Sequence, residues 1–327
     1  MDILSDKKIR YALWFILFFS FFIRIMGISY GLPLWLIDDE ATYPLSTLKM
    51  IQLHTLLPIL HLGEFKPILN YAPYLSIFYV PFYLVFLLLY AIWFLMHGGV
   101  LGNFVHYVAL DFSQFFLITR VLNVIFATVT VYLIYRASLH IFKRPIVGLL
   151  GSFFLGTSLL HSALSMTGRH WVPFAFLLSL CLVVLTHPEW SFRRRYISAA
   201  LIAGIGIGMD TSAVLIAFLI PCVYLFYEQR SFVLFFKEKV LWVSAIIIFV
   251  LSVFQFALYP AMVFVRDVTT PFGVSKSIQG FLINPFLFIK PIAISEPILI
   301  IFFIFGLFFV FQNKRNLFWT SFVYIYI

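Results

Sequence analysis

Residues 7–40 read KKIRYALWFILFFSFFIRIMGISYGLPLWLIDDE, and this stretch decides the fold class. It opens on a basic cluster, Lys7, Lys8 and Arg10, and continues as an apolar segment over residues 11–28. A secretory signal peptide has a similar layout, but here the apolar segment is long and no small-x-small cleavage site follows it. The sequence therefore predicts a retained first membrane span.

The composition of the whole chain also indicates a membrane environment. Hydrophobic residues make up 63% of the sequence, charged residues make up 11%, and Phe alone contributes 42 residues, with a mean hydropathy of +1.05. This apolar surface exceeds what one soluble core can bury, which indicates lipid as the solvent. Unpaired backbone groups are not tolerated in hydrocarbon, and the alternation of barrel strands is absent. The predicted fold class is an all-α polytopic membrane protein.

Apolar stretches recur along the chain, and two of them do not suit a simple crossing. The candidate membrane segments are residues 11–28, 74–97, 115–135, 146–164, 171–186, 196–227, 240–262, 297–311 and 317–327. The 74–97 stretch contains Pro81 and ends in Gly98-Gly99, so we expect a bent or re-entrant element on the outer side. The 196–227 stretch is too long for one span and is interrupted at residues 208–211, which predicts two short helices with an outward-facing tip.

The basic residues explain the net charge of +9. They fall in short clusters between apolar runs, as the positive-inside rule requires of cytoplasmic loops, and nucleic acid is not an expected partner. The clusters are Lys7/Lys8/Arg10, Arg136/Lys143/Arg144, Arg193/Arg194/Arg195, Arg230/Lys237/Lys239 and Lys314/Arg315. No Asn-x-Ser/Thr sequon occurs, which favours a prokaryotic cytoplasmic membrane.

With these assignments the chain is predicted to be one transmembrane domain over residues 1–327. The outer face receives a long first loop over about residues 29–114, a short loop around 162–171, the tip at Asp210 and a loop around 263–296. The sequence ends within an apolar run, so we expect an incomplete C-terminus. Cys181 and Cys222 lie inside apolar segments, which supports neither a disulfide framework nor a zinc site.

Three consecutive acids, Asp38-Asp39-Glu40, follow the first span in a chain with only 13 acids in total. Adjacent like charges repel, so a trio at the membrane surface indicates a cationic partner, a metal ion or a proton to move. The alternative is a solvated loop turn. Aromatic residues and prolines flank the trio and are expected to hold it at the interface, where a carboxylate can act as a general base.

Two arginines are expected near the same outer face. Arg120 lies near the outer end of the 115–135 span, where an ionised side chain needs a partner. A carboxylate of the acidic trio is one candidate, and snorkelling toward lipid headgroups is the other. Arg169 lies in a short outer loop, where a guanidinium suits a phosphate, either on a lipid-linked substrate or on a headgroup. His161 and His170 are too few and too poorly spaced for a metal site.

The order of these features resembles the GT-C glycosyltransferases. The resemblance rests on the Asp-Glu pair at 39–40, KPILNYAPY at 66–74, DFSQFFLITR at 111–120 and the Gly-Arg pair at 168–169. It extends over about residues 8–230, and the nearest branch is that of the protein O-mannosyltransferases and lipid A aminoarabinose transferases. It implies a GT-C-like helical bundle whose first outer loop contains juxtamembrane elements, the 74–97 segment among them.

The resemblance also implies roles. Asp39 becomes the base, Glu40 its neighbour in the catalytic loop, Arg120 a loop-positioning residue and Arg169 a contact to the donor phosphate. Two departures are Trp171, where relatives often have Asp, and Asp210 or a neighbour, where they often have Lys. The implied reaction moves a sugar from a polyprenyl-phosphate donor to a hydroxyl of a protein, lipid or glycan acceptor on the outer side, without a metal or other cofactor. Asp38, Glu40 and His170 are alternative bases.

Two other function classes are open at this point. A transporter also carries intramembrane charges, and Asp210 follows Gly204, Gly206 and Gly208 as in a broken-helix ion site, although no matching second half is visible. A catalytically inactive membrane scaffold is the third class. Ion flux in proteoliposomes is expected of the transporter, and sugar transfer from a lipid phosphate is expected of the enzyme.

Overall fold

The computed structural model describes residues 7–32, 40, 47, 49–50, 52–61, 64, 80–98, 113–209, 213–258, 294, 296–297, 300–301 and 304. Within these ranges every regular element is helical, as the apolar composition predicts. The elements are α1 (Lys7–Met26), η2 (Pro58–His61), α4 (Val80–Met96), α6 (Ser113–Phe142), α7 (Pro145–Thr157), α8 (Leu159–Ser165), α9 (Trp171–Leu185), α10 (Phe192–Met209), α11 (Val214–Cys222), the π-helix η5 (Val223–Tyr227), α12 (Phe232–Lys237) and α13 (Lys239–Leu258).

Two of these helices, α1 and α6, are long and apolar enough to cross a membrane, and the bent pair α7 and α8 makes a third if it counts as one span. Shorter apolar helices cover Leu87–Met96, Trp171–Leu185, Val214–Tyr227 and Lys239–Phe254. These lengths and compositions agree with an integral membrane protein.

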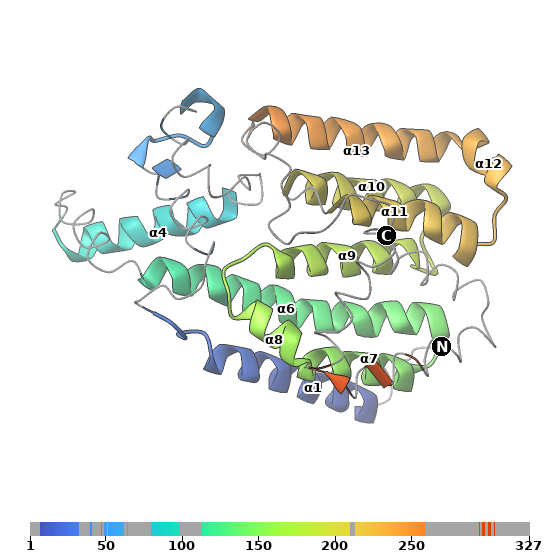
Figure 1. Cartoon of the computed structure of the whole chain (residues 1–327), viewed down its shortest axis with the longest axis horizontal. Coiled ribbons are helices and arrows are strands. Elements are labelled where there is room, and N and C mark those ends of the chain that lie inside the picture. Colours follow the sequence, from blue (N-terminus) through green and yellow to red (C-terminus); the bar gives the residue numbers. More distant parts are fainter. Residues whose placement is uncertain are drawn as a thin grey trace.

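The long helices pack side by side with their axes nearly aligned (Figure 1). In this view α13 lies above α10 and α11, followed by α9, α6 and then α7 with α1, and neighbouring helices in this order are in contact. The helix α4 lies largely beyond the end of α1 and α7 in the same view. Whether residues 74–97 fail to cross the bilayer stays a prediction, because residues 74–79 lie outside the described ranges.

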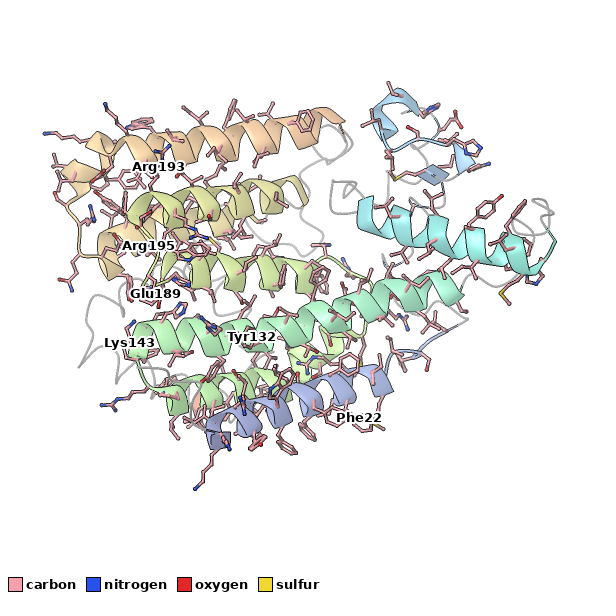
Figure 2. The ribbon with its side chains drawn as sticks, turned by 180° about the vertical axis from the view of Figure 1, so that it is seen from behind. Phe22, Tyr132, Lys143, Glu189, Arg193 and Arg195 are labelled. Atoms are coloured by element: carbon pink, nitrogen blue, oxygen red, sulfur yellow. The ribbon has the colours of Figure 1, made fainter. Side chains whose placement is uncertain are left out.

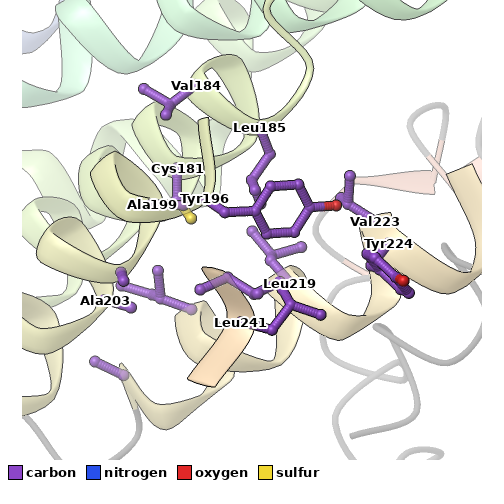
Figure 3. Packing of buried hydrophobic residues seen from close by; sticks show 14 residues of the cluster. Cys181, Val184, Leu185, Tyr196, Ala199, Ala203, Leu219, Val223, Tyr224 and Leu241 are labelled. Carbon is purple, nitrogen blue, oxygen red and sulfur yellow. The ribbon is translucent and has the colours of Figure 1, made fainter. Parts of the chain in front are cut away.

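The main apolar core joins α9, α10, α11 and α13 (Figure 3). The face of α10 that enters this core is lined by small residues, with Ala199, Ala200 and Ala203 fully buried. A side chain at Gly204 would place its Cβ 2.9 Å from the Cβ of Leu251 in α13. Small residues at such positions let two helix backbones approach closely, which is how helices gain packing energy in lipid.

Basic residues gather at one end of this bundle. Figure 2 shows Lys143, Arg193 and Arg195 at the same end, with Phe22 toward the other. Lys143 follows the last residue of α6, whereas Arg120 lies in the second turn of that helix. At ~1.5 Å per residue the two positions lie about 35 Å apart along the axis, roughly the thickness of a bilayer core. Arg120 therefore marks the end opposite to the basic one.

Two of the apolar segments are interrupted in the structure, and the sequence predicts only one of these breaks. The predicted break in residues 196–227 is confirmed, because α10 ends at Met209 and α11 begins at Val214; residues 210–212 lie outside the described part of the chain. The segment 146–164, expected as one span, is instead divided at Ser158, where α7 and α8 meet at an angle of 59°. We call this interruption the α7–α8 break.

A buried arginine of the first helix accounts for one side of the α7–α8 break. Arg24 is fully buried and donates hydrogen bonds to the carbonyls of Gly156 at 2.9 Å and Leu155 at 3.2 Å. It also contacts the Nδ1 atom of His161 at 2.8 Å. The last carbonyls of a helix have no partner within it, and a cation there interacts favourably with the helix dipole. Arg24 thus replaces the hydrogen bonds that a continuous helix would supply.

Candidate functional site

A buried ion pair lies at the end of the bundle opposite to the basic residues. The carboxylate of Glu40 accepts hydrogen bonds from Arg120 Nε at 2.7 Å to Oε1 and from Arg120 Nη2 at 2.7 Å to Oε2. Both side chains have no exposed surface. A bidentate pair of this kind fixes both position and orientation, because two parallel charge-assisted bonds form at once. Of the two alternatives that the sequence leaves open for Arg120, the structure shows pairing with a carboxylate of the acidic trio and not snorkelling.

The same arginine also fixes the chain that leaves α1. Its Nη1 atom donates to the carbonyl of Ile28 at 2.7 Å and to that of Tyr30 at 2.8 Å. One guanidinium therefore joins the exit of α1, the start of α6 and Glu40. Burying a charged pair costs several kcal/mol in desolvation, which is offset only when the remaining donors and acceptors are also satisfied. The hydrogen bonds from Arg120 Nη1 to the two carbonyls satisfy the donors that do not bind Glu40.

Glu40 connects this pair to a third segment, the turn between α8 and α9. The backbone N–H of Gly168 donates to Glu40 Oε1 at 2.6 Å. A glycine suits this position because a Cβ would lie 2.6 Å from Thr119 Oγ1 and 3.1 Å from Glu40 Oε1. The carboxylate therefore approaches the backbone more closely than any other residue type would permit. The Glu40 carboxylate thus joins Arg120 of α6 to the Gly168 turn.

Asn123 holds the other side of the same turn. Its Nδ2 group donates to the carbonyl of Thr167 at 2.6 Å and to that of Arg169 at 2.7 Å. Asn123 lies three residues after Arg120 on α6, so both side chains project from the same helix face. The backbone of residues 167–169 is thus bonded to α6 through Asn123 and to Glu40 through Gly168, which leaves little freedom to the residue that follows the glycine.

That residue is Arg169, whose side chain is half-buried and whose guanidinium carbon lies 4.0 Å from the centroid of the Trp171 ring. Stacking on an aromatic face helps to hold the guanidinium plane in one orientation. His170 is buried and begins α9 as its N-cap residue. The Trp171 that stands where relatives of the resembled family often have Asp therefore has a definite role as a platform for Arg169.

The sequence-predicted site residues divide into two groups. Glu40, Arg120, Arg169 and His170 are described, and the first three are linked within one bonded unit. Asp38, Asp39 and Asp210 lie outside the described residues, as do the 66–74 and 111–112 parts of the resembled motifs. Glu40, predicted with Asp39 as catalytic, is fully buried with both oxygens engaged. These contacts assign Glu40 to a positioning role.

Sequence reasoning missed three contributors. Asn123 and the Gly168 amide were overlooked because an amide within a span and a backbone N–H carry no charge that stands out in an apolar stretch. Arg24 did have a signal, since an ionisable residue inside the first apolar segment marks a paired or functional position. It was read as part of the span alone.

We expect Gly168→Ala to destabilise the protein by about 1–3 kcal/mol, because the added methyl group must displace Thr119 or Glu40 in a tightly packed site. Thermal unfolding in detergent measures this. The matched control is Gly151→Ala in α7, where a Cβ would lie in ordinary contact, 3.4 Å from Ile134 Cγ2. Alanine is the better helix former by roughly 0.5–1 kcal/mol, so this variant should be as stable as the parent or more so. Equal stability of both variants would contradict the tight fit at Gly168.

Among the residues that the structure describes, no group of three or more His, Cys, Asp or Glu side chains is close enough to hold a metal ion. No protein-family model, curated protein or solved structure matches this chain.

Proposed function

We propose that the chain is a membrane glycosyltransferase of the GT-C type, which moves a sugar from a polyprenyl-phosphate donor to a hydroxyl acceptor on the outer side of the membrane. The observation that carries the proposal is the buried Glu40–Arg120 pair with its Gly168 contact. It joins the acidic loop to the Gly168-Arg169 turn, although the two are 128 residues apart in sequence. Glu40, which follows the candidate base Asp39, is thus in direct contact with Gly168, which precedes the candidate phosphate ligand Arg169.

Adjacency in sequence limits how far apart the two chemical groups can lie. Asp39 precedes Glu40 and Arg169 follows Gly168, and consecutive Cα atoms are ~3.8 Å apart. The hydrogen bond between Glu40 Oε1 and the Gly168 nitrogen therefore joins the residue after the proposed base to the residue before the proposed phosphate ligand. A base and a phosphate ligand held in one region meet the geometric need of a transfer reaction between two substrates.

In the proposed reaction the Asp39 carboxylate accepts the proton of the acceptor hydroxyl. The hydroxyl oxygen then forms a bond to the anomeric carbon of the sugar, while the bond between that carbon and the phosphate oxygen breaks and its electron pair leaves with the phosphate. Negative charge grows on the departing lipid phosphate, where the Arg169 guanidinium stabilises it. Glu40, Arg120 and Asn123 hold these two groups without contacting the reacting atoms.

The α7–α8 break is a further broken helix of the kind whose exposed ends can bind ions in transporters. Here the carbonyls of Leu155 and Gly156 already accept hydrogen bonds from Arg24. Carbonyls that hold a guanidinium do not coordinate a transported cation. This contact argues against an ion site at the α7–α8 break, while the predicted transporter site at Asp210 lies outside the described residues.

Purified protein incubated with labelled polyprenyl-phosphate sugars and a panel of hydroxyl acceptors, followed by mass spectrometry of the products, tests the function. A glycosylated acceptor together with free polyprenyl phosphate is the expected result. Donor that remains intact with every acceptor, combined with substrate-dependent ion flux in proteoliposomes, would replace the enzyme by the transporter.

The outward orientation is tested separately. A cysteine introduced at position 39 should react with membrane-impermeant maleimide added to the outside of intact cells, because positive-inside counting places the acidic trio on that side. A cysteine at position 193, in the arginine cluster, is the control that should react only after permeabilisation. The reverse pattern would show that the site faces the cytoplasm.

A further inference from the structure

The other side of the α7–α8 break is held by a residue from far along the chain. Glu296 Oε1 accepts hydrogen bonds from Ser158 Oγ at 2.7 Å and from the backbone N–H of Leu160 at 2.7 Å. Its side chain is only 8% exposed. Glu296 lies 138 residues after Ser158 and beyond residues 8–230, which are the part of the chain that resembles the glycosyltransferases.

Arg24 and Glu296 act on opposite ends of adjoining helices. Arg24 binds the last carbonyls of α7, and Glu296 binds an N–H group in the first turn of α8. A cation at a helix C-terminus and a carboxylate at an N-terminus are the two arrangements that a helix dipole favours. The short helix α8 has seven residues, and a helix of that length does not hold its own direction without outside contacts. The contacts at the α7–α8 break therefore set the orientation of α8.

The far end of α8 leads directly into the site. Ser165 ends the helix, and the N–H and Oγ1 groups of Thr167 both bond to the carbonyl of Leu164, at 3.3 Å and 2.8 Å. Gly168 and Arg169 follow at once. The turn that carries Arg169 is therefore bonded to α8 on one side and to Asn123 and Glu40 on the other. A change in the direction of α8 moves this turn.

We propose that Glu296 is a positioning residue that places Arg169 through α8, an inference that rests on the proposed function only for the identity of the ligand that Arg169 binds. Glu296 contacts neither substrate in this scheme. By capping the start of α8 it fixes where the helix ends, and hence where the Arg169 guanidinium meets the lipid phosphate. A residue far along the chain thereby positions the donor site without contacting the donor.

The first measurement is independent of the reaction. A cysteine at position 169 (Arg169→Cys) is labelled with maleimide in detergent, where the buried native Cys181 and Cys222 contribute little background. Adding Glu296→Ala removes the acceptor of two buried donors, and we expect labelling at 169 to accelerate about tenfold, the equivalent of one to two lost hydrogen bonds. Glu296→Gln keeps an acceptor oxygen and should change the rate by less than about threefold. The control is a cysteine at exposed Glu189, at the basic end, whose rate Glu296→Ala should leave unchanged.

The second measurement uses the protein with Arg169 intact. Glu296→Ala should raise the Kd for undecaprenyl monophosphate and the KM for the sugar donor by about tenfold, with rescue in Glu296→Gln, whereas Glu189→Gln should match the parent. A purely structural role would lower the folded fraction and hence kcat, and would leave both KM and the labelling rate at 169 as in the parent. That result would overturn the proposal.

The two measurements separate failure of the inference from failure of the function. If the parent protein neither binds undecaprenyl monophosphate nor transfers sugar, the glycosyltransferase assignment fails. Accelerated labelling at position 169 in Glu296→Ala would still establish that Glu296 positions the turn. If Glu296→Ala fails to fold, Ser158→Ala removes only one of the two bonds to Glu296, and an unchanged labelling rate at 169 in that folded variant would refute the coupling.

Discussion

Arg120→Met is expected to destabilise the protein by about 3–5 kcal/mol, the cost of leaving a buried charge without its partner. The variant strands the fully buried Glu40 carboxylate and removes the donors to the carbonyls of Ile28 and Tyr30. The exit of α1 and the acidic loop lose their common anchor, so any transfer activity should disappear with stability. Thermal unfolding in detergent, followed by size-exclusion chromatography with fluorescence detection, measures the change.

A double variant separates the effect of an unpaired buried charge from the effect of losing the ion pair as a whole. In Glu40→Leu combined with Arg120→Met no charge is left buried, and replacing a whole buried pair by apolar residues is often neutral. We therefore expect this double variant to recover part of the stability but none of the activity, because the carbonyls of Ile28 and Tyr30 and the Gly168 N–H still lose their partners. Arg144→Met, at an exposed position with no side-chain cap bond at the start of α7, should lie within about ±0.5 kcal/mol of the parent. A single Arg120→Met variant as stable as the Arg144 control would refute the anchoring role.

Asp39→Asn is expected to reduce transfer by about 10²–10⁴-fold, the usual contribution of a general base, while donor binding stays close to that of the parent. The Asn amide preserves the size of the side chain but cannot take the proton from the substrate hydroxyl. Arg169→Ala should instead weaken donor binding as well as turnover, because its guanidinium is assigned to the lipid phosphate. Rates with labelled donor and binding of undecaprenyl monophosphate, measured on the same preparations, distinguish the two effects.

Near-normal transfer by Asp39→Asn would remove Asp39 from its central role and direct the search for the base to Asp38 or His170. Glu40 is the least suitable replacement, since its two oxygens hold Arg120 and the Gly168 amide. Asp38→Asn is the matched control, because it changes the neighbouring charge by the same amount without touching the assigned base.

The helical class, the interruption after Met209 and the pairing of Arg120 were all readable from the sequence. Each depends on a local rule: apolar runs in lipid become helices, a span too long and interrupted by glycine turns back, and a charge near the end of a span needs a counter-charge. These rules need no knowledge of which distant segments meet. They therefore predict the helices and the need of Arg120 for a counter-charge. They do not predict that the Gly168 amide also binds Glu40.

The α7–α8 break was not predicted, for a reason that lies in its long-range contacts. Residues 146–164 read as one continuous apolar stretch, and Ser158 alone does not end a helix. What stabilises the break is Arg24, more than 130 residues earlier, and Glu296, more than 130 residues later. Sequence patterns within a window of one helix carry no information about such partners. The same holds for Asn123, whose two carbonyl acceptors lie 44 and 46 residues away.

The break also constrains how the chain is made. The helix α7 has 13 residues and reaches only about 20 Å, less than the ~30 Å hydrocarbon core. During synthesis Arg24 is already present when α7 leaves the ribosome, and it can satisfy the carbonyls at the broken end at once. Glu296 is added 136 residues after Leu160, so the start of α8 has to wait for it. We therefore expect α8 to reach its final orientation only after the segment that carries Glu296 has been made.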